Sequence, residues 1–237
     1  IDEARARKLL NSFSLNAAIC DLDDTVAAAD FIVECAQPSV VESVVEAAIR
    51  HHRDCLIMSV GGLMDHPDLI AEAREKGVDI RIPSGAISGL DGIRAAMEAG
   101  LHHVTLTTRK PPKGLVGAPY LVENRIDVEN LTDAKVVFEG SARDACKAFP
   151  HNVNVAAALS LSGIGPDETR VRIIADPRAT ANTHEIVVEG AFGMFKTMTE
   201  NLASPRNPKS SYLASLSAVA ELRIVASQFV AHHQGLV

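Results

Sequence analysis

The sequence of 237 residues contains no tryptophan, and only 4% of its residues are aromatic. A surface on which nucleic-acid bases stack needs aromatic side chains, so such a surface is not expected. Positive charge is scarce as well, because 30 aspartates and glutamates outnumber 23 lysines and arginines and leave a formal net charge of −7. Binding of nucleic-acid phosphates needs clustered positive charge. The composition therefore favours a small-molecule enzyme or a binding module, and we expect no nucleic-acid partner.

Long uninterrupted apolar runs are also absent. A membrane-spanning helix is typified by roughly 18 consecutive apolar residues, which no window of this sequence approaches, so we expect no role in a membrane. The opening residues are polar and predict a helix rather than a signal peptide. The four cysteines (Cys20, Cys35, Cys55 and Cys146) show no paired spacing. This scatter favours unpaired thiols in a cytoplasmic protein over disulfides or a zinc site.

Short apolar segments alternate with amphipathic stretches in the first third of the chain. The apolar segments predict strands at 28–36, 55–60 and 78–83. The stretches between them have helical apolar spacing, at 40–49 and 67–76. Strands that alternate with helices of this length form right-handed βαβ units and a parallel sheet. We therefore expect a Rossmann-like α/β domain over residues 1–83.

The pattern changes after residue 83. Further strands are predicted at 103–110, 136–139, 169–176, 184–189 and 192–199. Tight connections join the last three, which makes them largely antiparallel. We expect a second, α+β domain over residues 84–205 with a mostly antiparallel sheet. Asn207 and Pro208 then predict the start of the longest helix, which spans 207–230, carries an apolar stripe and joins the first domain.

Ligands of a parallel α/β sheet bind beyond the carboxyl ends of its strands. Three loops are expected at that edge, at 35–38, 59–62 and 84–89. Their glycines let the backbone approach a bound group closely, although glycines also mark ordinary turns. Ala36, Gly85 and Ala86 lie on these loops and are candidates for contact with a ligand.

The densest polar cluster surrounds the end of one predicted strand and the start of the next. Asp176 and His184 lie there, and a hairpin-like connection can bring them within hydrogen-bond reach. A carboxylate behind an imidazole fixes its tautomer and raises its basicity, which suits a general acid or base near neutral pH. A surface hairpin whose polar residues face water explains the same spacing.

Four other polar residues are candidates for binding a ligand, and each also has an ordinary structural or surface explanation. Asn154, one turn into a predicted helix, is poorly suited to a helix interior and is a candidate for a ligand contact. Arg109, Lys110 and Lys209 are candidates for binding carboxylates, although solvated surface charge is the usual role of such residues. Three His-His pairs lack a carboxylate or cysteine at ligand spacing, and we expect no metal site.

Seven blocks of the sequence, among them S-G-A-I, T-R-K-P-P, F-P-H-N-V-N-V-A and N-T-H-E, resemble in order those of the L-aspartate dehydrogenase family. They lie at 83–91, 108–112, 137–141, 149–156, 175–177, 182–186 and 207–211. The similarity extends from about Asp30 to the long C-terminal helix. One such block is weak evidence, whereas seven in register are strong.

The resemblance implies an oxidoreductase that uses NAD or NADP to oxidise L-aspartate to iminoaspartate. That product hydrolyses to oxaloacetate and ammonia, or passes to quinolinate synthase for NAD biosynthesis. The resemblance also implies a homodimer, for which the open sheet of the second domain is a candidate contact.

The same resemblance implies that His184 is catalytic and that Ala86 and Asn154 contact the cofactor. On chemical grounds, His184 would take or relay the proton of the amine, or polarise the imine in reverse, with Asp176 as its orienter. The two substrate carboxylates need cations, for which Arg109, Lys110 and Lys209 are the candidates.

One departure from the pattern concerns the start of the sequence. Dinucleotide-binding domains open with a strand, a G-x-G-x-x-G turn and a helix whose amino end binds the pyrophosphate, and the sequence has no such motif. Either the first βα unit lies outside this sequence, which the intact later blocks favour, or the chain binds the cofactor poorly. Asp2 lies near the expected position of the acidic residue that binds the adenosine ribose. The choice between NAD and NADP stays open.

Two other functions fit the same observations. One is a related two-domain dehydrogenase that acts on another amino or keto dicarboxylate. The other is a non-catalytic binding protein that retains a dinucleotide-type scaffold without its phosphate loop.

Overall fold

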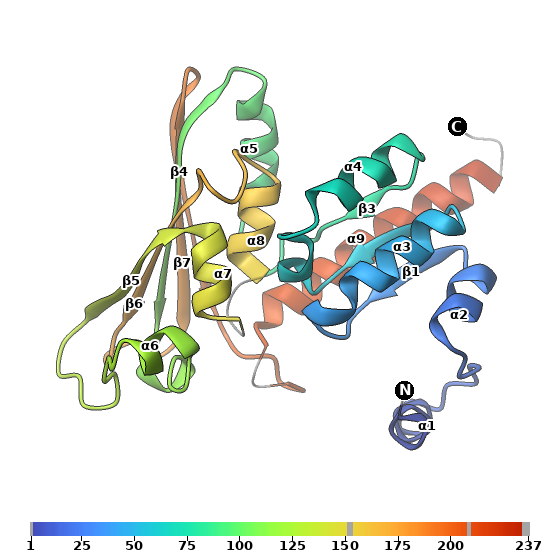
Figure 1. Cartoon of the computed structure of the whole chain (residues 1–237), viewed down its shortest axis with the longest axis horizontal. Coiled ribbons are helices and arrows are strands. Elements are labelled where there is room, and N and C mark those ends of the chain that lie inside the picture. The colour runs from blue at the N-terminus through green and yellow to red at the C-terminus, as the bar shows by residue number, and fades with distance from the viewer. Residues whose placement is uncertain (1, 151–153, 208–209, 234–237) are drawn as a thin grey trace.

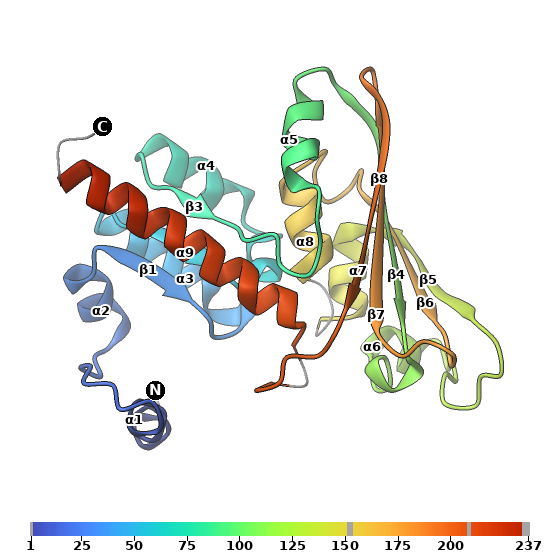
Figure 2. The same cartoon turned by 180° about the vertical axis from the view of Figure 1, so that it is seen from behind.

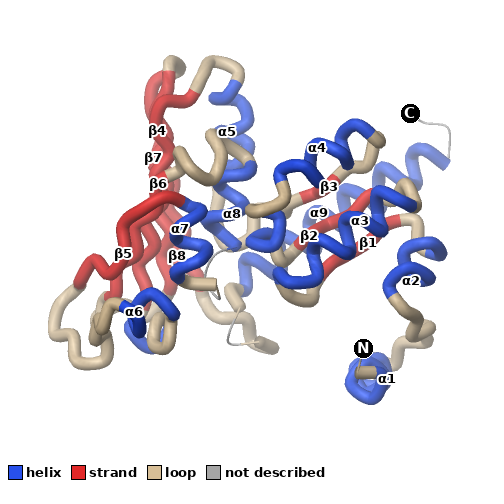
Figure 3. Tube along the Cα trace, viewed as in Figure 1, coloured by secondary structure: helices blue, strands red, loops and turns tan. Residues whose placement is uncertain are grey.

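The computed structural model describes residues 2–150, 154–207 and 210–233. These residues form two lobes, and each lobe is built on its own β-sheet with its own hydrophobic core (Figures 1 and 3). The long C-terminal helix returns to the first lobe.

The first lobe contains a three-stranded parallel sheet in the order β1-β2-β3. Its strands are β1 (Phe31–Glu34), β2 (Asp54–Ile57) and β3 (Ile80–Arg81). Helices α3 (Val41–Arg50) and α4 (Pro67–Glu75) cover one face of this sheet, and α9 (Tyr212–His233) lies along the other (Figures 1 and 2). The predicted parallel α/β architecture is confirmed.

Helix α3 shows why this lobe folds. Val41, Val45 and Ala48 recur at helical spacing and are fully buried against β2, where Ile57 is also inaccessible. Such a stripe of apolar side chains is removed from water only when the helix lies flat on the sheet. The two helices that precede β1 contribute less. Helix α1 (Glu3–Ser12) has no buried residue, and α2 (Leu22–Ala28) buries only Val26.

The second lobe contains a five-stranded sheet in the order β5-β6-β4-β7-β8. Its strands are β4 (Leu101–Lys110), β5 (Lys135–Ser141), β6 (Arg170–Ala175), β7 (Asn182–Gly190) and β8 (Gly193–Asn201). Only the β4–β6 pairing is parallel, so the predicted, mostly antiparallel sheet is confirmed.

Helices cover only one face of this second sheet, the face toward the first lobe (Figures 1 and 2). They are α5 (Leu90–Met97), α7 (Ala142–Ala148) and α8 (Asn154–Leu161), while the short α6 (Pro119–Glu123) packs near the ends of β4 and β7. The remaining short helices are η1 (Pro38–Val40), η2 (Val60–Leu63) and η3 (Pro112–Gly114).

The start of α9 differs from the prediction. The helix begins at Tyr212, whereas Asn207 belongs to a turn closed by the backbone hydrogen bond from Ser204 N to Ser210 O. The prediction that Asn207 caps the long helix is therefore wrong. Pro208 lies outside the described residues. The predicted apolar stripe is also largely exposed, since Leu216 and Ile224 are 46% and 48% accessible.

The expectation that no segment suits a membrane was too strict. By length and composition alone, Tyr212–His232 of the described chain is apolar enough to cross one. That expectation rests on an uninterrupted apolar run, which Glu221 and Arg223 break in this helix. Hydrogen bonds tie this helix to the first lobe instead, from Gly85 N to Ser217 Oγ and from Arg81 to Gln228.

Candidate active site

A row of side chains crosses four strands on the helix-covered face of the second sheet. The strand registers place Thr108 of β4 opposite His184 of β7, with Ile173 of β6 and Thr199 of β8 on either side. Residues directly opposite one another in neighbouring strands point to the same face. Ile173, Thr108 and His184 are all buried. The row therefore buries one polar pair, Thr108 and His184, between the apolar Ile173 and the half-buried Thr199.

Thr108 Oγ1 and His184 Nδ1 lie 2.9 Å apart and form a buried hydrogen bond. Lys110, two residues along the same face of β4, is 7% exposed. A narrow pocket between this face and the start of α8 is lined by Thr108 and Lys110 at its polar end, and otherwise by apolar side chains such as Phe149 and Val155. The structure thus brings together two of the predicted site residues, His184 and Lys110, and adds Thr108.

Burial determines the electrostatics of this group. It lowers the pKa of the Lys110 ammonium to about 8, because a buried cation loses its hydration. Burial, with a smaller contribution from the positive charge of Lys110, lowers the pKa of the His184 imidazole to about 3. At neutral pH the imidazole is therefore uncharged.

Asp176 does not orient His184 as predicted. Its carboxylate accepts hydrogen bonds from Arg109 Nη1 at 2.7 Å and from the Arg178 backbone N–H, which together hold its pKa below the usual range. The register of β4 with β6 explains this, since Asp176 follows β6 and its backbone N–H donates to Lys110 O. Asp176 therefore pairs with a side chain of β4 rather than with one of β7.

Contacts between the lobes connect the predicted ligand loops to this row. Ala86 O accepts hydrogen bonds from Thr199 Oγ1 at 2.8 Å and from Asn201 Nδ2 at 2.9 Å. Because Thr199 is the register partner of His184, the 84–89 loop lies one strand away from the imidazole. Asn154 Oδ1 accepts a hydrogen bond from Gly61 N in the 59–62 loop, at 3.2 Å. The sequence did not indicate that Thr199 belongs to the site. Its position in β8, opposite His184, is the one feature that could have done so.

A buried carboxylate that the sequence analysis missed joins the loops after β1 and β2. Glu34 is 3% exposed, and its two oxygens accept hydrogen bonds from Ala36 N, Ser59 N and Ser59 Oγ at 2.7–2.9 Å. A glutamate at the end of an apolar strand gives no sign of these contacts, because Ser59 lies 25 residues further along the chain. The carboxylate fixes the position of Ala36 at the edge where ligands of such sheets bind.

Two predicted contacts lie elsewhere. Asp2 caps α1 through a hydrogen bond from Arg5 N. Helix α1, which buries no residue, lies away from the three-stranded sheet (Figure 1). Lys209 lies outside the described residues.

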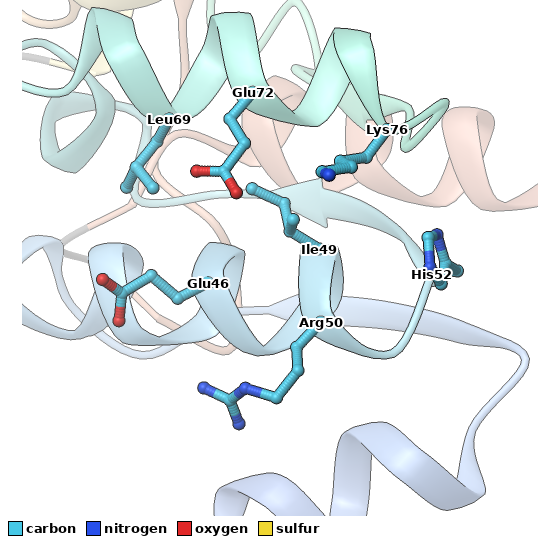
Figure 4. A pocket seen from close by; sticks show the side chains of 7 residues that line it. All are labelled: Glu46, Ile49, Arg50, His52, Leu69, Glu72 and Lys76. Atoms are coloured by element: carbon cyan, nitrogen blue, oxygen red, sulfur yellow. The ribbon is translucent and has the colours of Figure 1, made fainter.

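A separate groove lies between α3 and α4, away from the His184 row (Figure 4). Its lining mixes both signs of charge, with Glu46, Glu72, Arg50 and Lys76 around a few apolar side chains. It contains none of the predicted site residues.

Comparison with known proteins identifies the family. Residues 91–225 match the C-terminal domain of aspartate dehydrogenase, and residues 2–83 match the NAD-binding domain of homoserine dehydrogenase. The L-aspartate dehydrogenase of Methanosarcina acetivorans is 47% identical over 225 residues, which cover 93% of this chain and 83% of that protein. That of Bradyrhizobium diazoefficiens is 44% identical, over 94% of this chain and 79% of that protein.

The chain belongs to the L-aspartate dehydrogenase family. The crystal structure of aspartate dehydrogenase from Thermotoga maritima superposes with a TM-score of 0.69 at 27% identity, covering 90% of this chain and 80% of that one. The match of the first lobe to an NAD-binding domain makes NAD or NADP the cofactor of this L-aspartate dehydrogenase family member.

The loops at the strand ends leave room for part of such a cofactor. Gly85 has a left-handed φ of 64°, and a Cβ added there would meet no atom within 4 Å, so space is open beside its backbone. Asn154 contacts the 59–62 loop through Gly61 N, and Ala86 of the 84–89 loop contacts Thr199 of the second sheet. No contact to the pyrophosphate is assigned, because the sequence contains no glycine-rich phosphate turn.

Replacement of Glu34 by glutamine is expected to destabilise the protein. One amide N–H₂ group would then point at an N–H or O–H donor, and the free energy of unfolding would fall by roughly 1–3 kcal/mol. Ser59→Ala removes a single hydrogen bond and is expected to cost less. Thermal unfolding measures both changes, with the exposed Glu46→Gln on α3 as the matched control. An unchanged unfolding temperature for Glu34→Gln would show that the carboxylate holds nothing in place.

His184 is expected to remain neutral where exposed histidines become protonated. Its pKa of about 3 lies below the ordinary value of 6.5, so its ring should not titrate between pH 8 and pH 5 in nuclear magnetic resonance spectra. Because the folded-state pKa is depressed, the unfolded chain binds the extra proton first. The stability contributed by this residue is therefore complete above about pH 6.5 and is lost as the pH falls toward 3. A titration midpoint near 6.5 would contradict the burial of this ring.

Proposed function

We propose that this protein catalyses the NAD(P)-dependent oxidative deamination of L-aspartate to iminoaspartate, and the reverse reaction. Family membership supports the substrate, and one observation supports the site: His184 and Lys110 share a buried face that the 84–89 loop reaches through Thr199. The product would hydrolyse to oxaloacetate and ammonia. Since iminoaspartate is labile, we also propose a hand-off to quinolinate synthase for NAD biosynthesis.

Four residues at the lobe junction are proposed to hold the cofactor, namely Ala36, Gly85, Ala86 and Asn154. When bound, the nicotinamide ring accepts the hydride that leaves the substrate α-carbon. The Glu34 contacts keep Ala36 in position, and the Thr199 contact keeps Ala86 close to the His184 strand. In this proposal, these contacts hold the loops with Ala36 and Ala86 close to the face of the second sheet that carries His184.

Lys110 is proposed to bind a substrate carboxylate. A buried ammonium without full hydration gains more from a bound carboxylate than an exposed one does. The side chain of Arg109, the neighbouring candidate, is 41% exposed, so water screens its charge more and it is the weaker choice for this role. Lys209 remains a candidate for the second carboxylate.

His184 is proposed as the catalytic residue, holding or moving a proton at Nε2. Its Nδ1 is engaged by Thr108, which leaves Nε2 as the ring nitrogen available to a substrate. The uncharged ring avoids repulsion of the nearby Lys110 ammonium.

Aspartate-dependent reduction of NAD⁺ and NADP⁺ tests this function directly. We expect turnover with L-aspartate and at least about tenfold lower kcat/KM with L-glutamate, because one added methylene displaces a carboxylate from its cation. Loss of the imidazole in His184→Asn should lower kcat by about 10²–10⁴-fold while cofactor binding persists. The exposed His103→Asn, on the same sheet, is the matched control.

Two outcomes favour the alternatives. Turnover with another amino or keto dicarboxylate in preference to aspartate would support a related dehydrogenase. Cofactor or metabolite binding without any nicotinamide reduction would support a non-catalytic binding protein.

We propose that the protein works in the cytoplasm as a homodimer. All four cysteines are free, as in a reducing compartment. On the helix-free face of the second sheet, Met194 and Met198 of β8 are each 63% exposed beside the Glu185–Lys196 ion pair. Exposed apolar side chains on an uncovered sheet face support an isologous contact there.

Charge placed on this face is expected to separate the dimer. The double variant Met194→Glu, Met198→Glu buries two carboxylates in the proposed contact, so light scattering should give the mass of a monomer where the unmodified protein gives that of a dimer. Met97→Glu, on the exposed side of α5, is the control. A monomeric unmodified protein would refute the proposal.

A further inference from the structure

The imidazole of His184 forms its hydrogen bond with a hydroxyl group rather than with a carboxylate. Thr108 Oγ1 is its one hydrogen-bond partner among the residues that the structure describes, at 2.9 Å from Nδ1. Thr108 and His184 are 5% and 4% exposed and lie directly opposite each other in the β4–β7 register. Backbone geometry therefore sets the spacing of the pair, not a flexible loop.

The direction of this hydrogen bond follows from the chemistry of the hydroxyl. A threonine side chain has one hydrogen to donate, and a buried donor without an acceptor is costlier than a buried acceptor without a donor. In the described part of the chain, the Thr108 hydroxyl has no acceptor other than Nδ1. The hydroxyl therefore donates to Nδ1, and the single proton of the neutral ring resides on Nε2.

The charges around the ring favour the same state. A carboxylate behind Nδ1 would stabilise an imidazolium, but Asp176 pairs with Arg109 instead. Lys110 adds positive charge on the same face of β4, which disfavours a second one on the ring. The threonine contact orients the imidazole without charging it.

We propose that Thr108 is a positioning residue that holds His184 as a neutral imidazole with its N–H on Nε2, so that His184 acts on the substrate as a hydrogen-bond donor rather than as a base. This inference deepens the proposed function and rests on it for the identity of the substrate. It selects one of the two roles open to His184, the one that polarises an acceptor atom of the bound substrate.

The tautomer can be measured without substrate. In ¹⁵N-histidine-labelled protein at neutral pH, we expect the His184 resonances to show a protonated Nε2 and an unprotonated Nδ1 that accepts a hydrogen bond. The spectrum of His184→Asn identifies these resonances by their loss. A protonated Nδ1 overturns the proposal, whether or not the protein proves to oxidise aspartate.

Kinetics provide the second test. Thr108→Val keeps the shape of the side chain but loses the hydroxyl. Because one hydrogen bond is lost, kcat should fall roughly tenfold, while the KM for the cofactor stays unchanged. Thr108→Ser, which restores the hydroxyl, should recover kcat to within about threefold of the unmodified enzyme. The same substitution one residue away, Thr107→Val, changes the opposite face of β4 and serves as the control. If kcat of Thr108→Val equalled that of the unmodified enzyme, the positioning role would be overturned. If the unmodified protein did not oxidise aspartate at all, that result would count against the proposed function instead.

Discussion

Strand register in the second sheet determines what the active-site residues can do. Because β4 and β7 are antiparallel and in register, Thr108 must lie against His184, and alternation then places Lys110 on the same buried face. The same register pairs His184 with Thr199, whose hydroxyl donates a hydrogen bond to Ala86 O in the 84–89 loop. One row of side chains thus connects the imidazole to a ligand loop of the parallel sheet.

This arrangement explains why both lobes are needed. Parallel strands present loops at their carboxyl ends, where Glu34 joins Ala36 to Ser59 by accepting hydrogen bonds from both backbone N–H groups. A mostly antiparallel sheet presents a broad face instead, on which a few polar groups can be kept apart from water. The lobe junction combines the two, with the loops on the proposed cofactor side and the sheet face on the proposed substrate side.

Sequence periodicity predicted most of the elements because it reflects local burial. Apolar runs and helical spacing located the three parallel strands and α3, and strand alternation located β4. What sequence reasoning missed depends on contacts between distant segments. The turn closed by Ser204 and Ser210 delays the start of α9, and Asp176 pairs with Arg109 because β6 lies beside β4. Glu34 contacts Ser59, which follows the next strand in the sequence. The 84–89 loop made Ala86 one of several candidates for a ligand contact, and the resemblance implied that this contact is with the cofactor.

A crystal structure with NADP⁺ and L-malate, whose hydroxyl replaces the reacting amine, tests the central claim most directly. The account predicts L-malate between the nicotinamide ring and the second sheet, with His184 Nε2 within hydrogen-bond distance of its hydroxyl and Lys110 paired with a carboxylate. L-malate bound elsewhere, with His184 Nε2 facing only protein atoms, would contradict it.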